Sequence, residues 1–295
     1  MNAVRDRAAT QTYQVPVAIP PFPWPECRVP LVVLIAITIA EWITAAYDVR
    51  LGLPAHACIL AFLVMLGAGT SDTAKRELYW SLALAPIIRI GSLSLPLGRL
   101  PLLAWYPLIG VPIFAAAFIA KRKLGYTNGQ VGLRIPANLV PQVLIVPLGA
   151  ILGIGEYLIF RPAPLADRFT FASLWQPALV LLIFTGFEEE FIFRGLMQRA
   201  ALRALGRWGL VYVNLVFAAL HIGYLSVLDL FFVFFVGLLF AVFALKTRSI
   251  AGVTFAHGAV NISLFLILPY VAPVVLGTGY GDLLPLPLPP TQPLR

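Results

Sequence analysis

Long apolar runs separated by short polar connections make up most of this chain. Most runs approach or exceed 18 residues, enough for a helix to cross the ~30 Å hydrocarbon core of a bilayer. They are unbroken rather than alternating, so they favour helices over the strands of a closed barrel. The pattern predicts an all-α, polytopic membrane bundle of about eight or nine transmembrane helices, at 29–48, 52–70, 78–96, 101–120, 138–159, 173–198, 208–222, 226–245 and 250–276.

The polar and proline-rich segments divide the chain further. Residues 1–28 are polar and then proline-rich, and we expect them to form a disordered cytosolic leader. Residues 29–164 are predicted to be plain N-terminal transmembrane helices. Most of the unusual polar side chains lie in 165–276, which we expect to be the catalytic part. Residues 277–295 are expected to form a proline-rich tail.

Composition and charge agree with a membrane protein. Hydrophobic residues make up 60% of the chain and charged residues only 12%, which does not fit a soluble domain. The net charge of +8 comes from loop residues, without the basic and aromatic stretches of nucleic-acid binders, so we expect no nucleic-acid partner. Strongly basic connections follow only even-numbered spans. The positive-inside rule therefore predicts a cytoplasmic N-terminus and, with nine spans, an outside C-terminus, in a plasma (inner) membrane of bacterial type. The basic residues concerned are Lys75, Arg76, Lys121, Arg122, Lys123, Arg199, Arg203, Arg207, Lys246 and Arg248.

Three adjacent glutamates and an arginine interrupt the sixth predicted span. A charged side chain deep in a bilayer costs about 2.5–3.5 kcal/mol on insertion scales, so the cluster needs compensation or a function. In a helix, Glu190 and Arg194 are four residues apart in the order that favours an ion pair. Glu189 lies about 100° around the helix from Glu190 and can face a different neighbour. Glu188 receives no assigned role.

Two histidines lie in later spans, each with a partner four residues away. Phe217 precedes His221 and Asn261 follows His257, so each pair shares a helix face. Counted at 1.5 Å per residue from the basic connections, Glu189 and both histidines lie roughly 13–21 Å deep. We therefore expect them at comparable heights, in the middle or cytoplasmic part of the membrane.

These residue types suit hydrolysis. A carboxylate beside an imidazole can hold and deprotonate a water, and a second histidine with an asparagine amide can stabilise an oxyanion. Two histidines and a glutamate are also a known zinc ligand set. However, the sequence lacks His-Glu-x-x-His, and asparagine is a poor zinc ligand. We expect no cofactor and no metal, with zinc as the alternative. Cys27 and Cys58 form neither a disulfide framework nor a metal motif.

The ordered motifs resemble the CPBP family, also called ABI, which contains the type II CAAX prenyl endopeptidases and bacteriocin-processing or immunity proteins. The residues that carry the resemblance are Glu189-Glu190-x-x-x-Arg194, Phe217-x-x-x-His221 and His257-x-x-x-Asn261. The resemblance extends over roughly 173–265 and does not cover the first half of the chain. It implies an intramembrane endopeptidase that opens toward the cytosol and acts on membrane-associated peptides or proteins.

Roles follow from the resemblance by motif position. It implies that Glu189 activates water together with His221, while His257 and Asn261 stabilise the oxyanion. The supporting residues would be Glu190, Arg194 and Phe217. Eukaryotic members cut the last three residues from prenylated CAAX proteins, but nothing in this sequence indicates a prenylated substrate.

Other interpretations of the same residues stay open. The chain could be a non-catalytic scaffold or immunity protein of the same fold. It could also be a proton-coupled transporter that uses the buried acids and histidines as a relay, although it lacks the paired repeats typical of transporters. The remaining ionisable residues of the predicted spans have no recognisable partner or lie near a span end, and we expect packing or interfacial roles for them: Glu41, His56, Arg89, Glu156 and Asp229.

Overall fold

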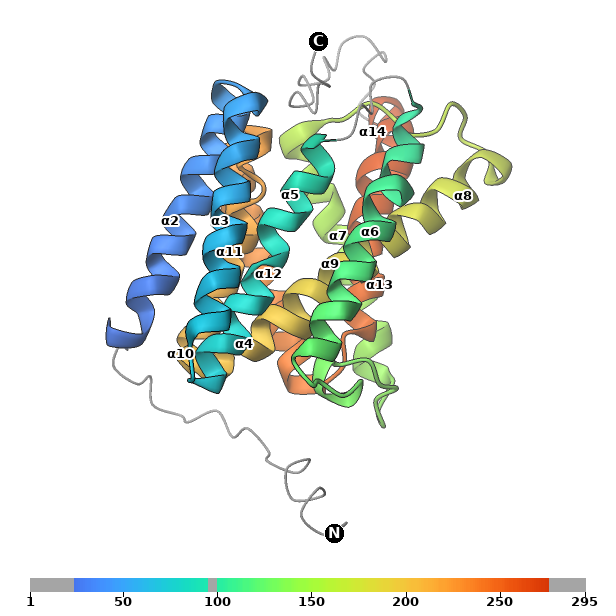
Figure 1. Cartoon of the computed structure of the whole chain (residues 1–295). Helices are drawn as coiled ribbons and strands as arrows, with labels where there is room; N and C mark the ends of the chain where they lie inside the picture. Colours follow the sequence, from blue (N-terminus) through green and yellow to red (C-terminus); the bar gives the residue numbers. More distant parts are fainter. Residues whose placement is uncertain (1–23, 95–99, 276–295) are drawn as a thin grey trace.

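The computed structural model describes residues 24–94 and 100–275, and this part of the chain is a bundle of helices without strands (Figure 1). The predicted all-α, polytopic membrane class is confirmed. Seven helices are long and apolar enough to cross a membrane. They are α2 (Trp24–Ala46), α3 (Val49–Gly69), α6 (Leu102–Lys123), α7 (Val140–Phe160), the composite Phe171–Leu205, α12 (Val227–Thr247) and the composite Ala251–Val275, which contains α13 (Ala251–Ile262), η6 (Ser263–Ile267) and α14 (Leu268–Val275).

Two of the nine predicted spans take a shorter or broken form. The third consists of α4 (Thr73–Leu82) and α5 (Leu84–Ser94), which are separated at Ala83. Pro86 lacks the N–H that would bond to the Leu82 carbonyl, so a continuous helix loses a hydrogen bond at this point. The seventh, α11 (Trp208–Ala219), continues into the short η5 (Ile222–Tyr224) and is apolar but shorter than a standard span.

The first helix begins earlier than the sequence predicts. α2 starts at Trp24, so residues 24–28 of the expected leader are helical. Pro25 occupies the first turn, where a missing N–H leaves no intrahelical bond unmade. The rest of the predicted leader and the whole predicted tail, 277–295, lie outside the described residues.

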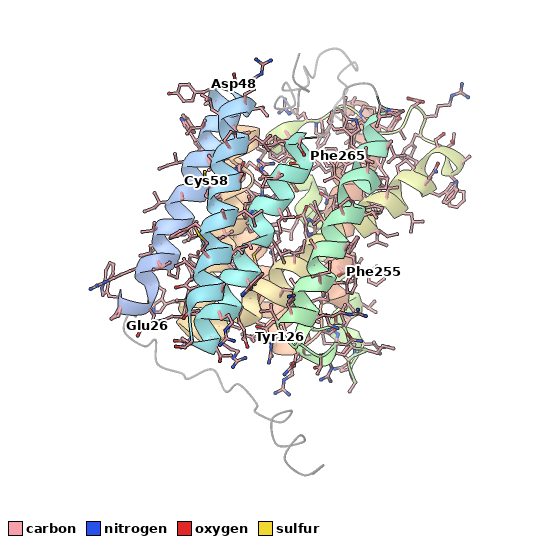
Figure 2. The ribbon with its side chains drawn as sticks, in the orientation of Figure 1. Glu26, Asp48, Cys58, Tyr126, Phe255 and Phe265 are labelled. Atoms are coloured by element: carbon pink, nitrogen blue, oxygen red, sulfur yellow. The ribbon has the colours of Figure 1, made fainter. Side chains whose placement is uncertain are left out.

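The basic connections lie together at one end of the bundle. Glu77 of α4 accepts a hydrogen bond from Arg203 at 2.5 Å and another from Tyr126, which follows α6, at 2.8 Å. The connection before α13 joins the same region, because the Ser249 hydroxyl donates to the Arg134 carbonyl at 3.0 Å. This end is the lower one in Figure 1, and Figure 2 shows Tyr126 there. Which side of the membrane it faces stays a prediction.

Helix α13 lies in close contact with its neighbours on two sides. A Cβ atom added at Gly149 of α7 would lie 2.1 Å from the Ala256 carbonyl oxygen. One added at Gly186 would lie 2.8 Å from the Thr254 carbonyl oxygen. Both positions must be glycine for the backbones to meet, which is how small residues act in membrane helix packing. The close packing brings His257 beside the glutamate stretch.

Candidate active site

The glutamates lie on one long helix that is widened on both sides of them. α8 (Phe171–Leu181) continues through η3 (Leu182–Phe187), α9 (Glu188–Glu190), η4 (Phe191–Met197) and α10 (Gln198–Leu205). Both η3 and η4 are π-turns, which are rare and are frequent at functional sites. Because these turns change the angular spacing of side chains, the carboxylates need not follow ideal α-helical positions.

The three carboxylates have different surroundings. Glu188 is buried and faces α6, where a Cβ added at Gly110 would lie 2.6 Å from a Glu188 carboxylate oxygen. Glu189 lines an internal cavity and keeps 31% of its side chain exposed. Glu190 is completely buried. Only Glu189 is therefore open to a water or a substrate in the cavity.

Glu190 joins Arg194 and His257. Its Oε1 lies 3.2 Å from Nη1 of Arg194, so the predicted ion pair is present, and 2.8 Å from Nδ1 of His257. The Arg194 guanidinium also donates to the Gly237 carbonyl at 3.1 Å and lies 4.6 Å from the centre of the Phe217 ring. The acid and the arginine compensate each other's charge away from water, and Glu190 also holds His257.

This hydrogen bond fixes how His257 presents itself to Glu189. A carboxylate only accepts hydrogen bonds, so Nδ1 of His257 carries a proton and donates the hydrogen bond to Glu190. The other ring nitrogen, Nε2, lies 3.8 Å from Oε2 of Glu189. The gap is longer than a hydrogen bond, and the ring is 12% exposed. His257 is thus oriented by one glutamate and faces the other.

His221 lies at the end of α11, where its ring is also fixed by the backbone. Its Nδ1 lies 2.9 Å from the Phe217 carbonyl oxygen, which can only accept, so Nδ1 is the protonated nitrogen. Nε2 is then a hydrogen-bond acceptor in the neutral ring. The Phe217 ring lies 4.8 Å from the His221 ring and 6.4 Å from the His257 ring, so this phenylalanine packs between both histidines.

Asn261 has a partner that sequence reasoning missed. Its amide donates to the Thr185 hydroxyl at 2.8 Å, and that hydroxyl in turn donates to the Leu181 carbonyl. Thr185 is four residues before Glu189, so a shared helix face was the only signal for it. The amide has a second N–H, which leaves it able to donate to another group.

One cavity of about 180 Å³ collects these side chains. Of the residues singled out in the sequence, it is lined by Glu189, Arg194, Phe217, His221, His257 and Asn261, while Glu190 lies buried behind His257. Thr185, Tyr106 and Glu156 also line it. The last two come from the helices before residue 165, where no motif points to them, and the packing or interfacial role expected of Glu156 stays a prediction.

The cavity extends away from the basic connections. Tyr106 is near the start of α6, Phe160 ends α7 and Tyr224 lies in η5, and all three line the cavity at the ends of helices opposite to those connections. The positive-inside rule predicts that this end faces away from the cytoplasm. The resemblance implies a cytosolic opening. The positive-inside rule and the resemblance therefore predict opposite sides for this end of the cavity, and both stay predictions.

A second group of charges supports the turn after His221. The Arg89 guanidinium makes two hydrogen bonds to Glu41, one of them at 2.5 Å, and His56 lies 3.3 Å from the same carboxylate without an aligned hydrogen bond. A Cβ added at Gly223, two residues after His221, would lie 3.1 Å from this guanidinium. Arg89 therefore has the partner that the sequence did not reveal, and it contacts the turn that positions His221.

Two histidines and a glutamate predicted zinc as the alternative to a metal-free site. Within 24–94 and 100–275, no group of three or more His, Cys, Asp or Glu side chains is close enough to hold a metal ion.

Comparison with known proteins agrees with the motifs. Residues 171–263 match the family described as Rce1-like, type II CAAX prenyl endopeptidase. No curated protein and no solved structure gives a match. The matched segment contains all three motifs, so the resemblance to CAAX-protease-like proteins is confirmed for this part of the chain. Together with the seven apolar helices, it identifies an integral, multi-pass membrane protein.

Proposed function

We propose that this protein is an intramembrane endopeptidase that hydrolyses a peptide bond in membrane-associated or lipidated substrates. The observation that carries the proposal is the cavity in which the partly exposed Glu189 faces His257, which Glu190 orients through Nδ1. The match to the Rce1-like family over 171–263 supports the same reaction class. Ionisable side chains inside a membrane-spanning segment usually serve a function, because inserting them into the bilayer is costly.

In the proposed reaction, Glu189 takes a proton from a water held in the cavity. The water oxygen then attacks the scissile carbonyl carbon, and the carbonyl oxygen becomes an oxyanion. Asn261 is a proposed donor to that oxyanion, and His257 is the second in its doubly protonated form, in which Nε2 also carries a proton while Nδ1 donates to Glu190. Collapse of the intermediate breaks the C–N bond, and Glu189 returns its proton to the leaving amine. His221, with Nε2 as acceptor, is the proposed second partner of the water.

The first test is replacement of the proposed base. Glu189→Gln keeps the side-chain size but cannot take a proton, so we expect cleavage to fall at least 10²-fold, the lower bound for a general base. The assay uses purified protein in proteoliposomes and quenched fluorescent peptides, acylated or prenylated, with products identified by mass spectrometry. Turnover by Glu189→Gln at the parent rate would contradict the proposal.

Two rival interpretations give different results in the same assay. A scaffold or immunity protein would cleave no peptide in either form, and a transporter would instead acidify or alkalinise the vesicle lumen in a manner dependent on Glu189. Zinc dependence is tested with the parent protein by adding a membrane-permeable chelator. The proposal expects full activity after chelation, whereas activity that is lost and then restored by added zinc would favour the zinc alternative.

A further inference from the structure

Tyr106 brings a hydroxyl into the cavity from α6. The residue lines the cavity, and its hydroxyl makes no hydrogen bond within 24–94 and 100–275. The unpartnered carboxylate oxygens of Asp229 are shielded from any incoming group, whereas the Tyr106 oxygen is accessible. A tyrosine hydroxyl that lies away from bulk water usually has a hydrogen-bond partner. This one is therefore placed to bond to a group that enters the cavity.

The contacts of α6 show which way Tyr106 faces. Four residues after it, a Cβ added at Gly110 would lie 2.3 Å from the Phe184 ring and 2.6 Å from a Glu188 carboxylate oxygen. Residues four apart share a helix face, so Tyr106 also faces the long helix of the glutamates. It packs against a small apolar cluster of Ala166, Leu181 and Leu266. Tyr106 thus faces the interior of the bundle, unlike an interfacial tyrosine that faces lipid.

The polar groups of the cavity lie at successive levels along the helices. Glu189 and His257 face each other at the deepest level. Thr185 and Asn261 lie one turn away on the same two helices and are hydrogen-bonded to each other at 2.8 Å. The apolar cluster that Tyr106 contacts includes the next turn of both helices, and the hydroxyl is still in electrostatic range of Glu189. Two turns rise roughly 11 Å, which an extended peptide covers in about three residues.

The neighbouring groups indicate what kind of acceptor Tyr106 meets. Thr185 and Asn261 already bond to each other, and Tyr106 is hydrogen-bonded to neither of them within the described residues. Glu189 and Glu156 line the same cavity, and their negative charges disfavour a substrate carboxylate there. A neutral acceptor fits this place better. Backbone carbonyls supply one such acceptor for every residue of a peptide.

We propose that the Tyr106 hydroxyl donates a hydrogen bond to a backbone carbonyl of the substrate, within about three residues of the scissile bond and distinct from the scissile carbonyl. This inference rests on the proposed function and adds a substrate-binding residue from outside the matched segment 171–263. Carbonyls inside a helix bond to amides of their own chain, so only an unwound segment presents a free one. Substrates are therefore expected to be extended or locally unwound at the site.

A chemical double-mutant cycle tests this hydrogen bond without requiring cleavage. The protein is the full chain carrying Glu189→Gln in nanodiscs, with and without Tyr106→Phe, which removes only the hydroxyl. The probes are acylated fluorescent peptides in which one backbone amide at a time is replaced by an (E)-alkene, a planar isostere without the carbonyl oxygen. The isostere also lacks the amide N–H, but this loss affects both proteins alike and cancels in the comparison. Fluorescence anisotropy measures the affinities, with empty nanodiscs as background.

The cycle has a defined expected result. At one position we expect the isostere to weaken binding by about five-fold or more, the scale of one hydrogen bond. After Tyr106→Phe, the same isostere should weaken binding by less than about two-fold. At the scissile position, located from the products of the parent protein, the isostere should weaken binding equally with and without Tyr106→Phe.

Controls separate this inference from misfolding and from the proposed function. Tyr47→Phe removes the same hydroxyl at an exposed position after α2 and should leave the coupling intact. Because the Tyr106 hydroxyl has no partner in the described residues, Tyr106→Phe should unfold within 2 °C of the parent protein; a lower midpoint would show a structural bond and overturn the inference. Absent binding, equal weakening at every position, or coupling at the scissile carbonyl would also overturn it. Coupling at one position without cleavage by the parent protein would instead overturn the proposed function and leave Tyr106 as a peptide-binding residue.

Discussion

The buried pair of Glu190 and Arg194 gives a prediction whose size follows from the structure. Glu190 is completely buried and the Arg194 side chain is 1% exposed. Glu190→Leu removes the carboxylate and leaves the guanidinium buried without its counter-charge. Breaking a buried pair from one side costs about 3–5 kcal/mol. His257 also loses the acceptor of its Nδ1 proton, which adds to the destabilisation.

The double variant makes this prediction specific. Replacing both partners, as Glu190→Leu with Arg194→Met, removes the uncompensated charge, and such apolar replacements of buried pairs are often neutral. We therefore expect the double variant to be more stable than the single one by about 2 kcal/mol or more. Lys75→Met is the matched control. Lys75 pairs with Asp72, but the two side chains are 44% and 48% exposed, so this pair should contribute less than about 1 kcal/mol to the free energy of unfolding.

Thermal unfolding in detergent, followed by tryptophan fluorescence, measures these differences. For a chain of this size, 3–5 kcal/mol corresponds to a lower midpoint by on the order of 10 °C. A single variant that unfolds within 2 °C of the parent protein would refute the reasoning. So would a double variant no more stable than Glu190→Leu, since the loss would then not come from an unpaired charge.

Three further predictions address other parts of the structure. Arg89→Met leaves the Glu41 carboxylate buried without its partner, so we expect a loss of about 3–5 kcal/mol by thermal unfolding, together with slower peptide cleavage. Gly149→Ala forces a Cβ into a backbone carbonyl and should destabilise by about 1–3 kcal/mol, whereas Gly69→Ala, in open space within α3, should be neutral or stabilising. Ala163→Cys, at an exposed position just after α7 and opposite to the basic connections, should react with a membrane-impermeant maleimide in whole cells if positive-inside orientation holds; labelling only in inverted vesicles would place this end on the cytosolic side.

Features that depend on local spacing could be predicted from the sequence. The spans follow from apolar length, and the Glu190–Arg194 pair follows from two residues four apart on a helix. The broken third span was not predicted, because apolar content does not report the bend between α4 and α5. The helix start at Trp24 was missed because prolines were interpreted as a leader, although the first turn of a helix tolerates proline.

Features that depend on tertiary contacts could not be predicted. Arg89 and Glu41 are 48 residues apart, and nothing in their local sequence links them. The resemblance implies that Glu189 works with His221, but the histidine nearest to it is His257, because the close packing of α13 against η3 sets that distance. The π-turns around the glutamates, which help to direct the carboxylates to separate surroundings, have no signature in apolar periodicity.

We propose that Glu189, alone among the three adjacent acids, is the base of a hydrolytic site. Glu188→Gln is the closest matched control, since it removes the neighbouring carboxylate that faces α6 instead of the cavity. The decisive measurement compares initial rates of peptide cleavage by Glu189→Gln and Glu188→Gln in proteoliposomes, at equal folded concentration. We expect Glu189→Gln to lose at least 10²-fold in rate while Glu188→Gln stays within about three-fold of the parent protein. Equal losses in the two variants, or a larger loss for Glu188→Gln, would contradict the claim.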